Sequence, residues 1–404
     1  MNRSRREFLK TAIGTPALLS LGAPVSAVLA RAASAADARK DTVLVAIQLS
    51  GGNDGLNTVV PYADDAYARA RTTLRLTGKD VLKIDDHVGL HPRMKGFARL
   101  LKEGRLAIVQ GTGYPKSDRQ HEKAMRDWHT AMPEQSECPT GWLGRASDTL
   151  CGGEATLAAG AFVGPIAMPL ALNARKACVP SVRSAAELTY RAEAPQAGPP
   201  EAATGENPLA DHVRAASQAA RLSDRQIKAV LAGGRGHYPN LGLAQELRTV
   251  AELVRADVGI RVFLTELGGG GIGGFDNHAI QRDNHASVLE QLSESVAAFA
   301  DDLARHNCLD RVVLVTFSEF GRTLSENGRH GTGHGAAAPM FVMGGRVRAG
   351  LIGKHPSLTD LDQDAPKHHT DFRQVYADLL DNWLGVDSKA VLGGAFKHPG
   401  LLRA

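Results

Sequence analysis

The sequence is poor in cysteine, and beyond its N-terminus it has no long apolar run. Its four cysteines, Cys138, Cys151, Cys178 and Cys308, are scattered along the chain and lack C-x-x-C spacing. A disulfide framework and a thiolate zinc site are therefore not expected. No stretch after residue 30 reaches the roughly 18 apolar residues that a membrane-spanning helix needs. We expect no stable membrane span in the mature protein.

The mature chain also lacks an excess of charge of one sign. The whole sequence is formally +4, but residues 1–35 alone hold five basic residues against the single acidic Glu7. The remaining residues are therefore formally neutral. A neutral chain gives no sign of the basic surface that binds polyanions, so we expect no nucleic-acid partner.

The N-terminus has the pattern of an export signal. Arg5-Arg6 is followed by Phe8-Leu9-Lys10, then by a weakly apolar stretch to Ala30 and by the small residues Ala33-Ser34-Ala35. Basic region, apolar region and cleavage site in this order indicate a twin-arginine signal over residues 1–35. We expect a periplasmic or secreted protein with the twin-arginine translocase as its partner during export. An oxidising destination permits a disulfide among Cys138, Cys151 and Cys178, but folding before export argues against it.

The mature chain alternates apolar strands with amphipathic helices. The expected strands are residues 43–49, 106–110, 260–265, 311–317 and 340–343. Expected helix faces lie at 247–254, 288–303 and 372–383, with apolar residues three or four positions apart. This alternation predicts an α/β fold with a large, mostly parallel sheet flanked by helices, over residues 36–404. Residues 138–236, with a Pro-rich and Ala-rich surface loop, are expected to form a cap or an insertion.

Polar residues gather at or near the ends of the expected strands, where open α/β sheets bind ligands. They are Asp54, Asp276, His278, Glu319 and His334. Carboxylates mixed with imidazoles suit zinc, manganese or iron better than calcium. The sequence therefore predicts a site for one or two divalent metal ions, zinc or manganese foremost.

Each of these residues also has a structural interpretation. Asp54 could make a turn, Asp276 could cap a helix, and Glu319 could pair with Arg322. His278 and His334 could be ordinary polar residues, and His285 could face solvent. The glycine run at 268–271 lacks the Gly-Lys-Ser/Thr ending of a phosphate loop.

Five motifs occur in the order found in an exported bacterial family. They are Gly51-Gly52-Asn53-Asp54-Gly55-Leu56-Asn57, His237-Tyr238-Pro239, Gly274-Phe275-Asp276-Asn277-His278, Ser318-Glu319-Phe320-Gly321-Arg322 and Gly331-Thr332-Gly333-His334-Gly335. Over nearly the whole mature chain, the sequence resembles the family called domain of unknown function fifteen-oh-one. That family is placed in the alkaline phosphatase and sulfatase superfamily. The resemblance implies an alkaline phosphatase-like sandwich, with Asp54, Asp276, His278, Glu319 and His334 in the positions of metal ligands.

The sequence departs from this pattern at three places. Phe320 stands where the superfamily has a second histidine, and Gly333 replaces the aspartate usual in relatives. Gln120 stands where relatives often have a serine that could be the nucleophile. Ser117 and Thr112 are the nearby hydroxyl groups.

We therefore expect a metal-dependent hydrolase that acts on a small anionic substrate, a phosphate or sulfate ester. In this hypothesis Arg322 neutralises the substrate and His121 assists proton transfer. The alternative is a non-catalytic periplasmic binding or structural protein that keeps the hydrolase fold.

Overall fold

The computed structural model describes residues 42–152, 158–188, 224–234, 236–268 and 274–403. The expected signal at 1–35, the loop at 194–201 and residues 269–271 of the glycine run lie outside this part of the chain. None of the helices described there is both long and apolar enough to cross a membrane. The four cysteines of this part of the chain form no disulfide bond with one another.

A nine-stranded sheet forms the centre of the described structure. In spatial order the strands are β13 (Gly350–Ile352), β5 (Leu106–Gly113), β12 (Ala338–Gly344), β9 (Val312–Phe317), β1 (Val43–Leu49), β8 (Val262–Leu267), β6 (Gly160–Val163) and β7 (Ser181–Val182), and β16 (Thr370–Asp371) pairs with β5. β1 lies between β8 and β9 and is parallel to both. The prediction of a mostly parallel α/β sheet is confirmed.

One strand runs against the others. β12 is antiparallel to both β5 and β9. Its first residues therefore lie at the edge of the sheet where its neighbours end. This reversal, which the apolar pattern does not encode, brings the segment before β12 to the carboxyl ends of the parallel strands.

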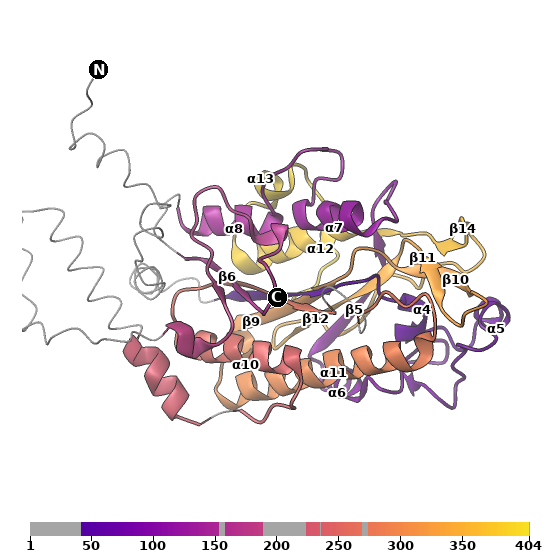
Figure 1. Cartoon of the computed structure of the whole chain (residues 1–404), viewed down its shortest axis with the longest axis horizontal. Helices are drawn as coiled ribbons and strands as arrows, with labels where there is room; N and C mark the ends of the chain where they lie inside the picture. The colour runs from indigo at the N-terminus through magenta and orange to yellow at the C-terminus, as the bar shows by residue number, and fades with distance from the viewer. Residues whose placement is uncertain (1–41, 153–157, 189–223, 235, 269–273, 404) are drawn as a thin grey trace, which may run out of the picture.

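Helices cover both faces of the sheet, which gives three layers (Figure 1). α6 (Lys95–Lys102), α10 (Gly242–Arg255) and α11 (Gln281–Arg305) pack on one face, and α7 (His121–Thr130), α8 (Trp142–Leu150), α12 (Phe372–Asp378) and α13 (Ser388–Leu392) pack on the other. Helix α12 continues into a π-helical turn, Leu379–Leu384.

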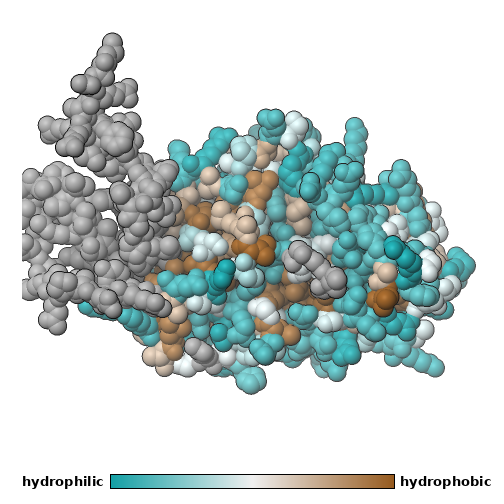
Figure 2. Space-filling model, in the orientation of Figure 1, coloured by the Kyte–Doolittle hydropathy of each residue, from teal (hydrophilic) through white to brown (hydrophobic). Residues whose placement is uncertain are grey.

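The side chains of β1 show why its sequence is apolar throughout. Val43, Val45 and Ile47 belong to the core beneath α11, whereas Leu44 and Ala46 belong to the core beneath α12. A strand buried on both faces needs a continuous apolar run, not an alternating pattern. In the view of Figure 1, apolar residues show in a band at the level of the sheet between mainly hydrophilic helix surfaces (Figure 2).

Small elements lie at one end of the sheet. They are α4 (Gly55–Thr58), β2 (Val59–Val60), α5 (Asp65–Ala70), β3 (Leu82–Lys83), β4 (Gly89–Leu90), β10 (Arg322–Glu326), β11 (Thr332–His334), β14 (Leu361–Asp362) and β15 (Ala365–Pro366). β10 and β11 form an antiparallel pair that aligns Arg322 with His334.

The described part of residues 138–236 is largely built into the fold. β6 pairs with β8 and with β7, so this region extends the sheet at its edge, and α8 packs on one face. The prediction of a cap or an insertion over 138–236 stays a prediction for the region as a whole. The apolar run of β6 is only four residues long, which is too short to distinguish a strand by pattern alone.

Candidate metal centre

Six of the seven predicted site residues meet at the carboxyl edge of the sheet. His121 opens α7, and Glu319 follows β9. Asp276 and His278 lie between β8 and α11. The β10–β11 pair supplies the last two, Arg322 and His334.

Three of these side chains form a close triangle. Oδ1 of Asp276 lies 3.0 Å from Nε2 of His278 and 3.2 Å from Nε2 of His334, and the two Nε2 atoms are 2.8 Å apart. A tetrahedral zinc ion with bonds of about 2.0–2.1 Å holds its ligand atoms about 3.3 Å apart. The three atoms are therefore nearly at the spacing of one face of a zinc tetrahedron, and their residue types fit the metal.

His121 stands beside the triangle. Its Nε2 lies 3.5 Å from Oδ2 of Asp276, and its Nδ1 lies 3.0 Å from Oε1 of Glu319. Ligand atoms of His121, Asp276 and His334 all lie within 4.8 Å of one another. Two overlapping triads, which share Asp276 and His334, are thus available for an ion.

The triangle is open to solvent. The side chains of His278 and Asp276 are 38% and 43% exposed, and that of His334 is 21% exposed. Nδ1 of His334 lies 2.7 Å from the carbonyl oxygen of Arg119, which leaves Nε2 facing the triangle. Such an outer contact orients an imidazole for metal binding.

Arg322 is buried and faces the protein. Its guanidinium donates to Oδ1 of Asp276 at 2.7 Å and to the carbonyl oxygens of Gly51, Gly52, Phe275 and Thr332. The side chain is only 1% exposed. Arg322 therefore fixes Asp276 and the segment after β1, and it pairs with Asp276 and not with Glu319. The predicted contact of Arg322 with an anionic substrate stays a prediction.

The charges of the centre follow from these contacts. Partial burial is the largest single influence on Asp276 and opposes its ionisation, but the hydrogen bond and charge of Arg322, together with His278 and His334, outweigh it and lower the pKa of its carboxyl. The bond to Glu319 raises the pKa of His121, whereas desolvation lowers the pKa of His278. An ionised Asp276 and a neutral His278 are the states in which these groups bind a metal.

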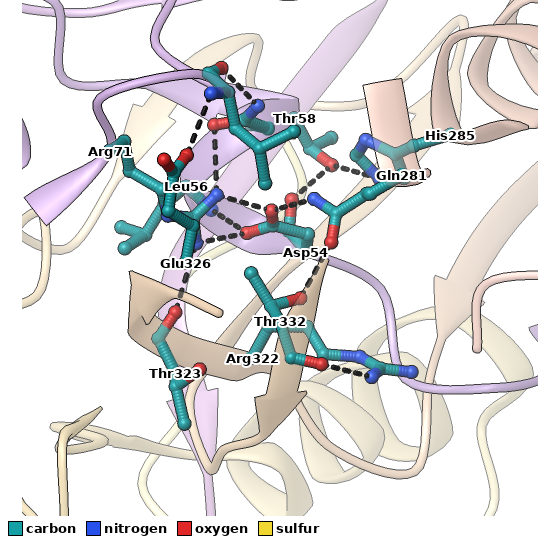
Figure 3. A network of polar contacts seen from close by, with 12 residues as sticks. Asp54, Leu56, Thr58, Arg71, Gln281, His285, Arg322, Thr323, Glu326 and Thr332 are labelled. Carbon is teal, nitrogen blue, oxygen red and sulfur yellow. Dashed lines mark hydrogen bonds and ion pairs between the residues drawn. The ribbon is translucent and has the colours of Figure 1, made fainter. Parts of the chain in front are cut away.

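Asp54 has other partners. Its carboxylate makes a two-point ion pair with Arg71, with distances of 2.6 and 3.0 Å, and also accepts hydrogen bonds from Gln281 and from the backbone of Leu56 (Figure 3). Burial alone would raise its pKa, but the charge of Arg71 lowers the pKa of Asp54 to about 2. The structure thus favours the turn interpretation, because Asp54 caps α4. With both oxygens engaged, it is left out of the metal site proposed below.

The carboxylates of Asp54 and Asp276 belong to one connected network of hydrogen bonds. Gln281 bonds Asp54 through its amide nitrogen and accepts from Thr332 through its oxygen. The carbonyl oxygen of Thr332 in turn accepts from Arg322 (Figure 3). His285 is buried 3.0 Å from Oδ1 of Asn53, which corrects the expectation that it faces solvent.

The two hydroxyl groups that the sequence offers as nucleophiles differ in exposure. Thr112 is fully buried and donates to the carbonyl oxygen of Ala338, whereas Ser117 is half-buried. Gln120 is exposed and precedes His121 at the start of α7. Gly333 donates to the hydroxyl of Thr323, and a Cβ there would lie 3.1 Å from that threonine's methyl group.

Sequence reasoning missed a second polar group at the same edge. Ser50 follows β1, and Glu266 lies near the end of the adjacent β8. Their side chains are hydrogen-bonded to each other. The available signal was the appearance of Gln48, Ser50 and Glu266 at the ends of otherwise apolar strands.

The fold and this centre define an α/β protein with a carboxylate–imidazole site at the carboxyl ends of its strands. The model of the family "Protein of unknown function (DUF1501)" matches residues 41–397. The chain belongs to this family. No curated protein matches the sequence.

Several solved structures share features of the fold. The lipoteichoic acid synthase LtaP from Listeria monocytogenes is 10% identical, with a TM-score of 0.36 over 78% of this chain and 68% of its own. The C-terminal periplasmic domain of EptC from Escherichia coli, solved with zinc, is 9% identical, with a TM-score of 0.36 over 75% and 73%. A protein of the alkaline phosphatase superfamily from Vibrio parahaemolyticus is 12% identical, with a TM-score of 0.36 over 91% and 76%. Similarities this low carry no conclusion about activity.

Proposed function

We propose that this protein is an exported, metal-dependent hydrolase of phosphate or sulfate esters. The observation that carries the proposal is the triangle of Asp276, His278 and His334, with atoms 2.8–3.2 Å apart at the carboxyl edge of the sheet. The family resemblance to the alkaline phosphatase and sulfatase superfamily supports the choice of ester.

Asp276, His278 and His334 would hold one zinc or manganese ion. A bound divalent ion supplies positive charge that offsets the charge of an anionic ester. Arg322 keeps Asp276 in place and needs no contact with substrate. Glu319, first predicted as a ligand, instead accepts from the backbone of Gly51 at 2.7 Å and holds His121 at 3.0 Å.

His121 is assigned the proton transfer. With Nδ1 held by Glu319, its Nε2 faces the centre, and the raised pKa favours the protonated ring. An alcohol leaving an ester must take up a proton, and a positioned histidine supplies one at a gain of roughly 10²–10⁴ in rate. Nε2 of His121 is therefore the proton donor to the leaving oxygen.

Hydrolysis tests the proposal directly. The protein lacking residues 1–35 is loaded with zinc or manganese and assayed with p-nitrophenyl phosphate and p-nitrophenyl sulfate. Hydrolysis of one of these is expected to require metal and to fall about 10²–10⁴-fold in His121→Ala while bound metal is retained. His87→Ala is the matched control, because His87 is exposed.

The outcomes separate the alternatives. If the metal-loaded protein hydrolyses neither ester, the hydrolase proposal fails and a binding role takes its place. If His278→Ala keeps both metal and full activity, the ligand assignment is wrong.

Export has its own test. Arg5→Lys together with Arg6→Lys in the full chain is expected to hold the protein in the cytoplasm, measured by cell fractionation. The control, Arg3→Lys, changes a basic residue outside the pair. Unchanged release of the double variant would contradict the twin-arginine route.

A further inference from the structure

A serine–carboxylate pair lies next to the proposed metal centre. Oγ of Ser50 donates to Oε1 of Glu266 at 2.5 Å and accepts from the side-chain amide of Gln48 at 2.8 Å. Nε2 of His129, on α7, lies 2.6 Å from the oxygen of that amide. The serine is therefore oriented by two groups, one of which is a carboxylate able to take its proton.

The Ser50–Glu266 pair is connected to the proposed metal centre through the backbone next to Ser50. The amide nitrogen of Gly51, bonded to the carbonyl carbon of Ser50, donates to Oε1 of Glu319 at 2.7 Å. The same oxygen lies 3.0 Å from Nδ1 of His121. The carbonyl oxygen of Ser50 accepts from the backbone of Phe275, the residue before Asp276, at 3.0 Å. Ser50 thus sits between the segments that carry His121 and Asp276.

Other hydroxyl groups at this edge are less suited to attack a substrate. Ser318 is 4% exposed and donates to the carbonyl oxygen of Leu49. Thr332 is fully buried and donates to Gln281. Ser50 is half-buried and so is Glu266. Ser318 also lies 3.2 Å from Oε2 of Glu319, but it is buried, so of these three hydroxyls only Ser50 combines partial exposure with a carboxylate acceptor.

The free oxygen of Glu266 is also informative. Oε2 is buried and has no hydrogen-bond partner among the described residues. A carboxylate with an unpaired buried oxygen is poorly stabilised as an anion. Burial accordingly raises the pKa of Glu266. A carboxylate destabilised in this way is a stronger base than an exposed one.

We propose that Ser50 is the nucleophile of this protein and that Glu266 is the base that activates it. This assignment depends on the proposed ester hydrolysis, and it supplies the nucleophile that Gln120 cannot provide. A nucleophile within hydrogen-bond reach of a base, itself oriented by further groups, is the usual arrangement of covalent catalysis.

The chemistry balances in two steps. In the first, the proton of Ser50 passes to Oε1 of Glu266, Oγ forms a bond to phosphorus or sulfur, and the ester bond breaks. The leaving oxygen takes the proton of His121 and departs as the alcohol. In the second, water gives a proton to His121 and attacks the serine ester, while Oγ regains its proton from Glu266. The products are the alcohol and inorganic phosphate or sulfate.

A fluorophosphonate probe tests Ser50 without the natural substrate. Oγ of an activated serine bonds to phosphorus, fluoride leaves, and the proton passes to the base, so the adduct is stable and can be mapped by peptide mass spectrometry. The metal-free wild-type protein is expected to carry the adduct on Ser50. Glu266→Gln, which keeps the shape of the side chain, is expected to react about a hundredfold more slowly.

Matched variants control the labelling. Ser117→Ala removes the half-buried hydroxyl near α7 and is expected to label at the wild-type rate. Ser50→Ala is expected to lose the adduct with an unchanged circular dichroism spectrum. Because the adduct is mapped on the wild-type chain, the conclusion does not depend on the folding of either variant.

The outcomes distinguish the two proposals. An adduct on Ser117, or no adduct in a protein that hydrolyses the esters, would overturn the assignment of Ser50 and leave the hydrolase intact. An adduct on Ser50 in a protein that hydrolyses neither ester would support a reactive serine but refute the proposed function. An adduct on Ser50 that forms equally fast in Glu266→Gln would overturn the role of Glu266.

Discussion

Two aspartates near the same edge of the sheet have opposite surroundings. Asp54 is 2% exposed and is paired at two points with the fully buried Arg71. Asp276 is 43% exposed and faces His121, His278 and His334 in addition to Arg322. Arginine stays charged and offers only donors, whereas imidazole nitrogens can also bind a metal. The comparison teaches that the partners of a carboxylate, more than its place after a strand, decide between a structural and a chemical role.

The largest expected effect on stability comes from breaking the buried pair. Asp54→Asn leaves the charge of Arg71 buried without a counter-charge, which costs about 3–5 kcal/mol in the free energy of unfolding. Urea unfolding measures this loss. Asp360→Asn is the control, because its ion pair with Lys367 is exposed and is worth at most about 1 kcal/mol. Equal losses in the two variants would contradict the structural role of Asp54.

The same pair predicts a pH dependence. The folded-state pKa of Asp54 is lowered to about 2 from 3.8, so its contribution is present above pH 4 and is lost as the pH falls through 2. The shift corresponds to about 2 kcal/mol. Urea unfolding of wild type and Asp54→Asn across this range isolates the effect. If the two stability curves stay parallel, the pair does not contribute as described.

Arg322 links Asp276 to the segment after β1, and its replacement is expected to have an intermediate effect. Arg322→Lys keeps the charge but cannot bond Asp276 and several carbonyl oxygens together. A weakened outer contact of this kind typically reduces metal affinity about 10–100-fold. Zinc titration of the folded variant measures it, with Arg99→Lys, a half-exposed surface arginine, as control. Unchanged affinity would show that Arg322 does not position Asp276.

The smallest effect is expected on stability, from a change at Ile280, two residues after His278. Ile280 precedes α11 with φ 48° and ψ 42°, and its side chain is 71% exposed. A branched side chain in this left-handed conformation is strained by about 1–2 kcal/mol. Ile280→Gly is therefore expected to raise stability by about 1 kcal/mol in thermal unfolding. Ile166→Gly, at an exposed position without positive φ, should not stabilise. A destabilised Ile280→Gly would contradict the strain.

The sequence predicted the central strands well because their chemistry is local. The range expected for β1 is the observed one, since a doubly buried strand must be apolar throughout. Strand β5 instead runs on through Gly113, past the expected end at Gln110. The direction of β12 could not be predicted, because apolar residues pack equally well in either direction.

The grouping of the candidate site residues was predicted only in part. The rule that ligands gather at strand ends correctly grouped Asp276, His278 and His334. It could not show that Arg71, distant in sequence, neutralises Asp54, nor that Arg322 faces inward. Those are pairings between separate segments, and a single sequence holds no direct record of them.

Zinc titration calorimetry on the metal-free protein tests the central claim most directly, with Asp276→Asn and Asp54→Asn compared in their folded states. We predict that wild type and Asp54→Asn bind zinc with similar affinity, whereas Asp276→Asn loses most of the binding. If wild type binds no zinc, or if Asp276→Asn binds it as wild type does, the Asp276 cluster is not a metal centre.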